Sequence, residues 1–178
     1  MITLLALLLS AVAVGPRETA VLVYPKERSW FRRVFYSPHQ DALQERLRRR
    51  YDLRVHEQVA TDDELFAIDV RGAKVLVLSG HGDPFAMFFA SRKERTLDSS
   101  DHARLERFLT QLDPGATIVL QSCHTGRGFA HLVKSAAGGR RVIAATGEVP
   151  PDGMEIVALT PLEVTMTCTD GRDCTIRL

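Results

Sequence analysis

The sequence lacks an excess of charge of either sign. Its 23 lysine and arginine residues face 22 aspartate and glutamate residues, which gives a formal net charge of +1. A chain this close to neutral has no overall field that attracts nucleic acid or an anionic membrane. The short basic cluster from Arg46 to Arg50 ends an expected helix, where cations complement the helix dipole. We therefore expect no nucleic-acid partner, and no membrane contact beyond a possible N-terminal anchor.

Internal repeats, low-complexity stretches and the histidine or cysteine spacings of a metal site are also missing from the sequence. The 178 residues, 45% of them apolar, suffice to bury one core but are too few for two ordinary domains. We predict a single domain over residues 19–178, without a metal or another cofactor.

Long apolar runs are scarce, and the exception lies at the N-terminus. Residues 1–14 are almost all apolar, and Gly15, Pro16 and Arg17 end the run. The run is too short to span a bilayer comfortably, and its end contains a small-x-small cleavage motif, Ala-Val-Ala. No lysine or arginine precedes it. We interpret residues 1–14 as a signal peptide that exports the protein, either secreted or periplasmic; a retained anchor and a misread first strand are the alternatives.

Cysteine is scarce too, with three residues in the chain. Cys168 and Cys174 flank a short Thr-Asp-Gly-Arg-Asp turn between two β-prone runs, residues 162–167 and 175–178. This pattern predicts a C-terminal β-hairpin that brings both cysteines together. In an oxidising compartment they should form a disulfide, which would stabilise the fold by about 2 kcal/mol. Cys123 is then the odd thiol.

Apolar runs of strand length alternate with amphipathic helical patterns along the chain. The Ser37-Pro38 pair predicts the start of the first helix, and the Thr61 capping pattern predicts the start of the second. Two more helices are expected at residues 98–112 and 128–137, and four buried strands at residues 19–24, 74–79, 117–120 and 141–145. A short amphipathic strand is expected at residues 53–59. This alternation predicts an α/β fold with a mostly parallel sheet and helices on both faces.

Two reactive side chains follow the ends of two successive buried strands. His81 comes two residues after Ser79, and Cys123 comes three residues after Leu120. If these strands are neighbours, about 4.8 Å apart, the two side chains can face each other at the carboxyl edge of the sheet. His81 could then move the thiol proton, and the helix expected after Cys123 would favour the thiolate. Taken singly, each residue also fits a structural role, as a small buried hydrophobe or an ordinary turn histidine.

A glycine beside the histidine suggests an oxyanion hole. Because Gly82 has no side chain, its N–H can approach a substrate carbonyl, and the Cys123 N–H would be the second donor.

Together these residues match the motifs of a known family. One motif, Ser-Gly-His81-Gly, follows an apolar strand, and a second, Gln121-Ser-Cys123-His-Thr-Gly126, follows another apolar strand some forty residues on. This pair of motifs resembles the caspase-like cysteine peptidases: caspases, metacaspases, legumains, gingipains and small bacterial relatives. The likeness covers roughly residues 19–147. It implies a caspase-like three-layer sandwich in which Cys123 is the nucleophile, His81 the general acid/base and Gly82 an oxyanion donor. It also implies an endopeptidase that cleaves peptide or protein substrates through a thioester acyl-enzyme.

The resemblance extends to the residue that reads P1, the substrate residue before the cleaved bond. Metacaspase-like enzymes have an acidic residue two positions before the nucleophile, whereas this chain has Gln121, as caspases do in a pocket for P1 aspartate. Arg28 could supply a guanidinium for such a carboxylate, and a solvated loop arginine is its alternative reading.

Two departures from the family keep other functions open. The region after the fourth buried strand, residues 141–145, is brief, and no linker divides a large from a small subunit. A catalytically inactive caspase-like binding or scaffold domain is one alternative. A hydrolase or transferase that uses the same dyad on a non-peptide acyl group is another.

Overall fold

The computed structural model describes residues 16–26, 30–90 and 97–178. The expected leader, residues 1–14, and Arg28 lie outside the described residues. No helix in the described ranges is both long and apolar enough to cross a membrane.

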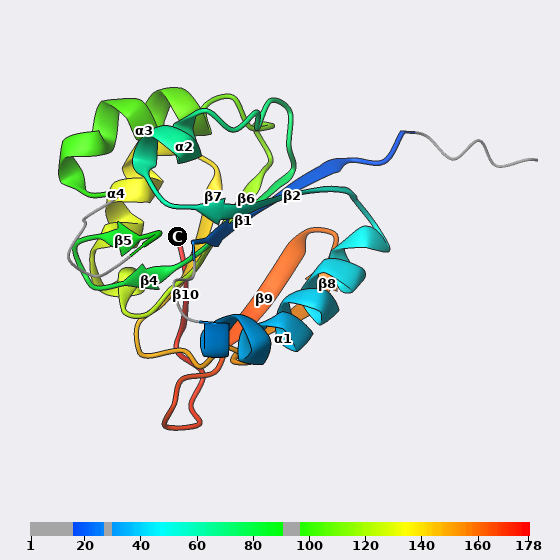
Figure 1. Cartoon of the computed structure of the whole chain (residues 1–178). Coiled ribbons are helices and arrows are strands. Elements are labelled where there is room, and N and C mark those ends of the chain that lie inside the picture. The colour runs from blue at the N-terminus through cyan, green and yellow to red at the C-terminus, as the bar shows by residue number, and fades with distance from the viewer. Residues whose placement is uncertain (1–15, 27–29, 91–96) are drawn as a thin grey trace, which may run out of the picture.

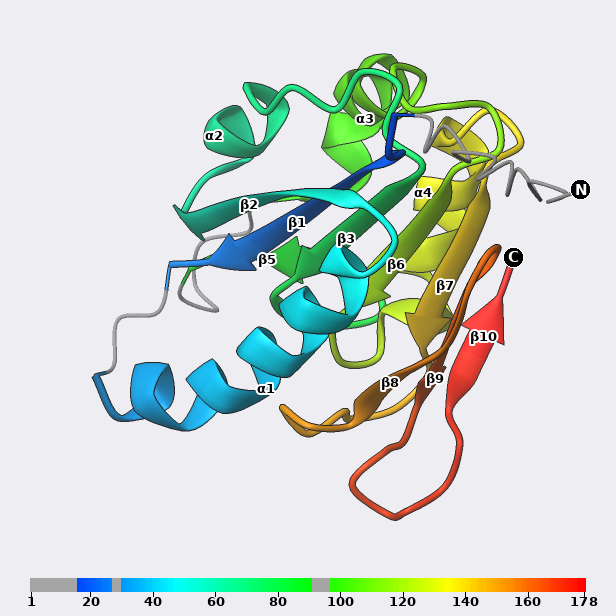
Figure 2. The same ribbon diagram turned by 90° about the vertical axis from the view of Figure 1, so that its right-hand side faces the viewer.

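A six-stranded sheet forms the middle of the molecule (Figures 1 and 2). Its strands are β1 (Thr19–Pro25), β2 (Asp52–Val59), β3 (Val75–Ser79), β6 (Thr117–Gln121), β7 (Arg141–Ala145) and β10 (Thr175–Arg177). They lie in the order β10-β7-β6-β3-β1-β2, and all neighbours are parallel except β10 and β7. The α/β fold with a mostly parallel sheet is thus confirmed.

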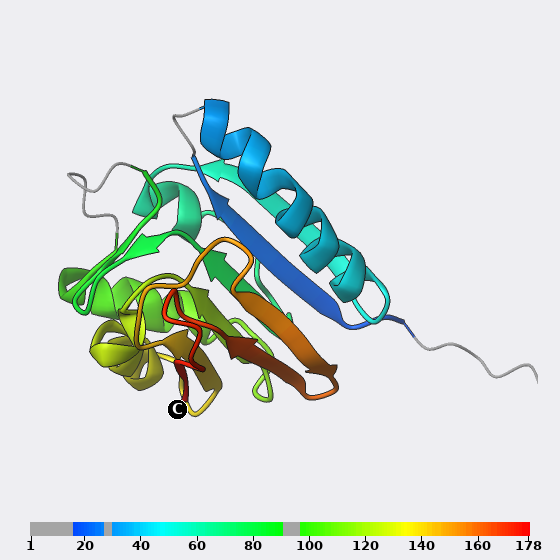
Figure 3. The ribbon, with the colours of Figure 1, turned by 90° about the horizontal axis from the view of Figure 1, so that it is seen from below.

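Helices cover both faces of this sheet, as predicted. One face carries α2 (Asp62–Phe66), α3 (His102–Leu109) and α4 (Phe129–Ala136), the last two preceded by the 3-10 turns η1 (Ser99–Asp101) and η2 (Thr125–Arg127). The other face carries α1 (Trp30–Arg48) and an antiparallel hairpin of β8 (Met154–Leu159) and β9 (Leu162–Met166). Figures 2 and 3 show α1 and this hairpin next to each other on the same face of the sheet.

Alternation of side chains along the strands divides the interior into two cores. In β3, Leu76 and Leu78 enter the core beneath α2, α3 and α4, whereas Val75 and Val77 enter the core beneath α1 and the β8–β9 hairpin. Strands buried on both faces are typical of parallel sheets between two layers, which explains their nearly continuous apolar sequence.

A buried arginine donates hydrogen bonds at the carboxyl ends of two helices on the first face. Arg140 is only 6% exposed, and its guanidinium donates to four carbonyl oxygens near the ends of α3 and α4, those of Thr110, Leu112, Asp113 and Ala137. The Asp113 and Ala137 carbonyls also accept from backbone N–H groups, whereas among the described residues those of Thr110 and Leu112 accept from Arg140 alone. The last carbonyls of a helix have no partner within the helix, so this side chain satisfies groups that would otherwise be unpaired.

The predicted C-terminal hairpin is not confirmed, because its two expected arms pair with different strands. β9 pairs with β8, and β10 pairs with the edge of β7; only an isolated bridge between Thr167 and Asp173 joins the arms beside the turn. The unpaired N–H and C=O groups along β7 explain this choice, because β10 satisfies them. Residues 154–159 form β8, a strand that was not predicted from the sequence.

The disulfide between Cys168 and Cys174 is confirmed. Such a bond is consistent with an oxidising, exported compartment.

The first helix begins earlier than predicted. α1 starts at Trp30, so the Ser37-Pro38 pair lies inside it and does not open it. Its last turn contains Arg46 and Arg48, as the basic cluster predicted.

Candidate active site

The register of two strands brings His81 and Cys123 to the same edge. β3 and β6 are adjacent, and Ser79 pairs with Gln121 at their carboxyl ends. His81 and Cys123 each lie two residues beyond this pair. Because neighbouring strands are about 4.8 Å apart, the two residues leave the sheet beside each other. The adjacency that the sequence analysis assumed is therefore correct.

Both residues line one cavity of about 90 Å³. Its other walls come from the end of β1, from α1 and from the chain after β7, through Tyr24, Pro25, His39, Gln40, Leu43, Val149, Pro150 and Pro151. His81 and Cys123 are each half-buried. A ligand in the cavity can therefore reach both side chains.

Cys123 lies in a sharp turn after β6. The next residue, His124, has a left-handed backbone with φ of 59°, a conformation that costs a non-glycine residue of order 1 kcal/mol. The turn continues through η2, and α4 begins at Phe129, six residues after Cys123 and next to the predicted start at residue 128. The thiol donates a weak hydrogen bond to the Val149 carbonyl, with 3.8 Å between Sγ and O.

His81 lies on a short hairpin of β4 (His81–Gly82) and β5 (Met87–Phe88), where it pairs with Phe88. The Asp83 carboxylate accepts from the backbone N–H groups of residues 85 and 86 and closes the tip. The Pro84 carbonyl in this tip accepts from the N–H of Phe129, the first residue of α4, at 2.7 Å. The hairpin that carries the histidine is thus attached to the helix that follows the cysteine.

Gly82 packs directly on the turn that contains Cys123. A Cβ atom at this position would lie 2.2 Å from Ser122 Oγ and 2.8 Å from the Cys123 carbonyl oxygen. No other residue type fits here, because both contacts are far inside normal atomic separations. The close approach brings the Gly82 backbone to Cys123, whose own N–H donates no hydrogen bond to another residue in the described ranges.

Gln121 has a fixed side chain at the junction of two cavities. The Ser79 hydroxyl donates to Gln121 Oε1 at 2.5 Å, which leaves the amide NH₂ of Gln121 as a donor. Besides the first cavity, Gln121 lines a second one of about 190 Å³ between α1 and β8. Charged side chains of Arg46, Asp152 and Glu155 also line this second cavity.

Several residues of this region were missed by the sequence analysis. Arg46 was interpreted only as a helix-ending cation, since the cavity that it lines together with Gln121 is formed in part by β8, which was not predicted. Ser122 Oγ and Tyr24 Oη are buried without a hydrogen bond that meets normal geometry in the described residues. Burial raises the pKa of Tyr24 above its usual range, so the phenol stays neutral at the cavity wall.

No protein-family model and no curated protein matches this chain. The fold and the site geometry define it as an α/β protein with a cysteine and a histidine in one cavity at the carboxyl edge of a parallel sheet.

Proposed function

We propose that this chain is a caspase-like cysteine endopeptidase, with a caspase-like three-layer sandwich, in which Cys123 is the nucleophile and His81 the general acid/base. The supporting observation is that both half-buried side chains line one cavity, next to a glycine that packs on the nucleophile turn. A thiol needs a nearby base or a stabilised thiolate to act as a nucleophile, and the cavity provides the base.

The chemistry then follows from these positions. The thiol turns away from the Val149 carbonyl, His81 takes its proton, and Cys123 Sγ attacks the carbonyl carbon of the peptide bond. The backbone N–H groups of Gly82 and Cys123 stabilise the oxyanion. His81 gives the proton to the leaving amine, which leaves a thioester on Cys123. Water, deprotonated by His81, hydrolyses the thioester and restores the thiol.

Gln121 would read the P1 side chain. Its free NH₂ group is a hydrogen-bond donor, so it favours an acceptor such as the carboxylate of aspartate or the carbonyl of asparagine. Arg46 in the second cavity would add a cation, in addition to the proposed role of Arg28. Asp152 and Glu155 line the same cavity and would favour a basic side chain, so P1 preference tests this assignment directly.

We also propose that the protein is exported and that residues 1–14 are its signal peptide. The disulfide supports an oxidising destination.

One observation favours a second candidate, a caspase-like binding or scaffold domain without turnover. The Cys123 thiol donates to a main-chain carbonyl, a contact that a purely structural cysteine could keep permanently. In a peptidase this contact would exist only in the resting state of the enzyme.

Cleavage of a peptide library distinguishes the two candidates. The folded wild-type protein and a Cys123→Ala variant are incubated with the library, and mass spectrometry identifies new termini. We expect cuts after aspartate or asparagine that the variant does not make. Cuts after arginine or lysine would contradict the role given to Gln121, and no cuts by folded wild-type protein would favour the binding domain.

A further inference from the structure

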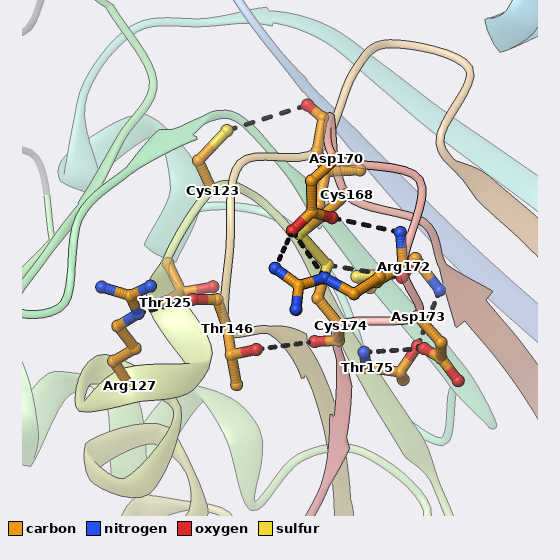
Figure 4. The surroundings of a disulfide bond; sticks show 12 residues. Cys123, Thr125, Arg127, Thr146, Cys168, Asp170, Arg172, Asp173, Cys174 and Thr175 are labelled. Atoms are coloured by element: carbon orange, nitrogen blue, oxygen red, sulfur yellow. Dashed lines mark hydrogen bonds and ion pairs between the residues drawn. A yellow bond between two sulfur atoms is a disulfide. The ribbon is translucent and has the colours of Figure 1, made fainter.

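The segment after β7, residues 146–149, lies between the disulfide and the nucleophile turn. Figure 4 shows Cys123, Thr146 and the two cysteines of the disulfide in one group. On the disulfide side, Thr146 N donates to the Cys174 carbonyl at 2.9 Å, and Thr169 N donates to the Glu148 carbonyl at 2.9 Å. The segment is therefore bonded to both ends of the loop that the disulfide closes.

Gly147 lies in close contact with the disulfide. A Cβ atom at Gly147 would lie 2.3 Å from Cys168 Sγ and 3.8 Å from Cys174 Cβ. The disulfide thus packs directly on the main chain at this position, and any side chain there would push the two apart.

On its other side the same segment supports the nucleophile turn through its carbonyl groups. The Gly147 carbonyl accepts from His124 N at 2.8 Å, and the Val149 carbonyl accepts from the Cys123 thiol. The Thr146 carbonyl accepts from Arg127 Nε at 2.6 Å. Val149 and the two residues after it also form a wall of the cavity that contains Cys123.

We propose that Gly147 and the Cys168–Cys174 disulfide are positioning residues for Cys123. The disulfide fixes the loop of residues 168–174, the loop fixes residues 146–149, and these hold both the nucleophile turn and the cavity wall. Besides the disulfide, backbone bonds from Cys168 N to Arg172 O and from Cys174 N to Met166 O join the two ends of the loop, and a bond from Gly171 N to Cys168 O lies within it. The disulfide is the covalent link among these restraints. The proposal rests on the proposed function for the identity of the reactive residue, but the positioning can be measured without turnover.

Reduction of this disulfide would loosen the site. A thiolate of an external dithiol attacks one sulfur, the other sulfur leaves as a thiolate, and the second thiol of the reagent displaces the mixed disulfide. Two electrons and two protons pass to the protein, which gains two thiols, while the reagent becomes a cyclic disulfide. Cys123 takes no part in this exchange and stays reduced. The site is therefore fully assembled only when Cys168 and Cys174 are oxidised and Cys123 is a free thiol.

Two variants and one matched control test the proposal. The double variant Cys168→Ser/Cys174→Ser removes the cross-link, and Gly147→Ala keeps it but separates it from the segment. Gly115→Ala is the control, because a Cβ there meets its nearest atom, Asp113 Oδ1, at an ordinary 3.4 Å. Amide hydrogen exchange, alkylation of Cys123 by iodoacetamide, and labelling by a peptidyl acyloxymethyl ketone are measured for each protein.

We expect exchange of the His124 amide and alkylation of Cys123 to accelerate about tenfold or more in both test variants, because the turn opens toward small reagents. Ketone labelling should slow about tenfold or more, because the peptide part of this reagent needs the cavity wall. Exchange in β1 and β3 and all properties of Gly115→Ala should match the wild type. Reduced wild-type protein should behave like the double variant, and reoxidation should restore it.

Unchanged exchange at His124 in Gly147→Ala would overturn the proposal, as would an equal acceleration in β1 and β3, which marks a general loss of stability. If the double variant does not fold, the results for Gly147→Ala and the reduced wild type decide whether the proposal holds. If the wild type takes up no ketone, the proposed function fails, whereas the exchange and alkylation results still test the positioning.

Discussion

The two faces of the sheet differ in what covers them. Beneath α2, α3 and α4 lies an almost wholly apolar core, and Arg140, the charged side chain buried there, donates only to main-chain carbonyls. The other face is covered by α1 and the β8–β9 hairpin, and both described cavities lie against α1. The first face serves stability, whereas the second leaves room for a ligand beside the strand ends. Substitutions on the two faces should therefore have different consequences.

The largest effect is expected at the cavity. Cys123→Ala should reduce peptide cleavage about 1000-fold or more, because no other thiol can form the acyl-enzyme. Its free energy of unfolding should change by less than about 1 kcal/mol, since the half-buried thiol makes only one weak hydrogen bond. Cleavage assays and urea unfolding check the two parts. Peptide cleavage by the variant would contradict the role of Cys123, and a large loss of stability would contradict the claim that the second face contributes a ligand site more than stability.

Arg140→Leu should show the opposite behaviour. Removal of the guanidinium takes a donor from four carbonyl groups and leaves those of Thr110 and Leu112 without any, and we expect a loss of about 3 kcal/mol in the free energy of unfolding. Cleavage by the protein that remains folded should stay at the wild-type rate. The matched control is Arg107→Leu on the exposed side of α3, which should change stability by less than about 0.5 kcal/mol. Equal losses in both variants would contradict the role of Arg140.

Gln121→Leu tests whether a side chain at the second face determines P1 specificity. Loss of the amide donor should reduce cleavage after aspartate about 10- to 100-fold, with little change in thermal stability. Ser79→Ala is the comparison, because it removes only the hydroxyl that fixes the Gln121 amide, and a smaller reduction is expected. An unchanged P1 preference in Gln121→Leu would show that other residues read the substrate.

The smallest effect concerns an ion pair at the sheet edge. Hydrogen bonds from Arg141, with a further contribution from Arg177, hold the pKa of Glu163 below its usual range. A lowered pKa in the folded state means that the carboxylate stabilises the fold above its unfolded pKa of about 4.3, and that this contribution disappears as the pH falls through the lower folded value.

Glu163→Gln should therefore lower the free energy of unfolding by about 0.5 to 1 kcal/mol at pH 7. The difference from the wild type should shrink as the pH falls below about 4. Urea unfolding at several pH values measures it, and a difference that grows toward acid would contradict the assignment.

Much of the first face and of the strand ends could be predicted from the sequence. β1, β3, β6 and β7 are apolar runs bounded by glycine, proline or charged residues, and such runs between helices are typical of a parallel sheet. The neighbouring positions of His81 and Cys123 follow once β3 and β6 are adjacent.

The covering of the second face could not be predicted in the same way. β8 has no clean alternation, because its register shifts between Ile156 and Ala158, and it follows a proline-rich stretch typical of loops. The start of α1 was placed too late because Ser37-Pro38 is itself a typical helix start. The second cavity and the contacts of residues 146–149 depend on these long-range arrangements, which no local pattern encodes.

The central claim is that His81 activates Cys123 within one cavity. The most direct test is intact mass spectrometry after exposure to peptidyl acyloxymethyl ketones with aspartate, asparagine, arginine or lysine at P1. We predict one adduct per wild-type molecule, none with Cys123→Ala, and labelling about 100-fold slower or more with folded His81→Ala. Labelling of His81→Ala at the wild-type rate would contradict the claim.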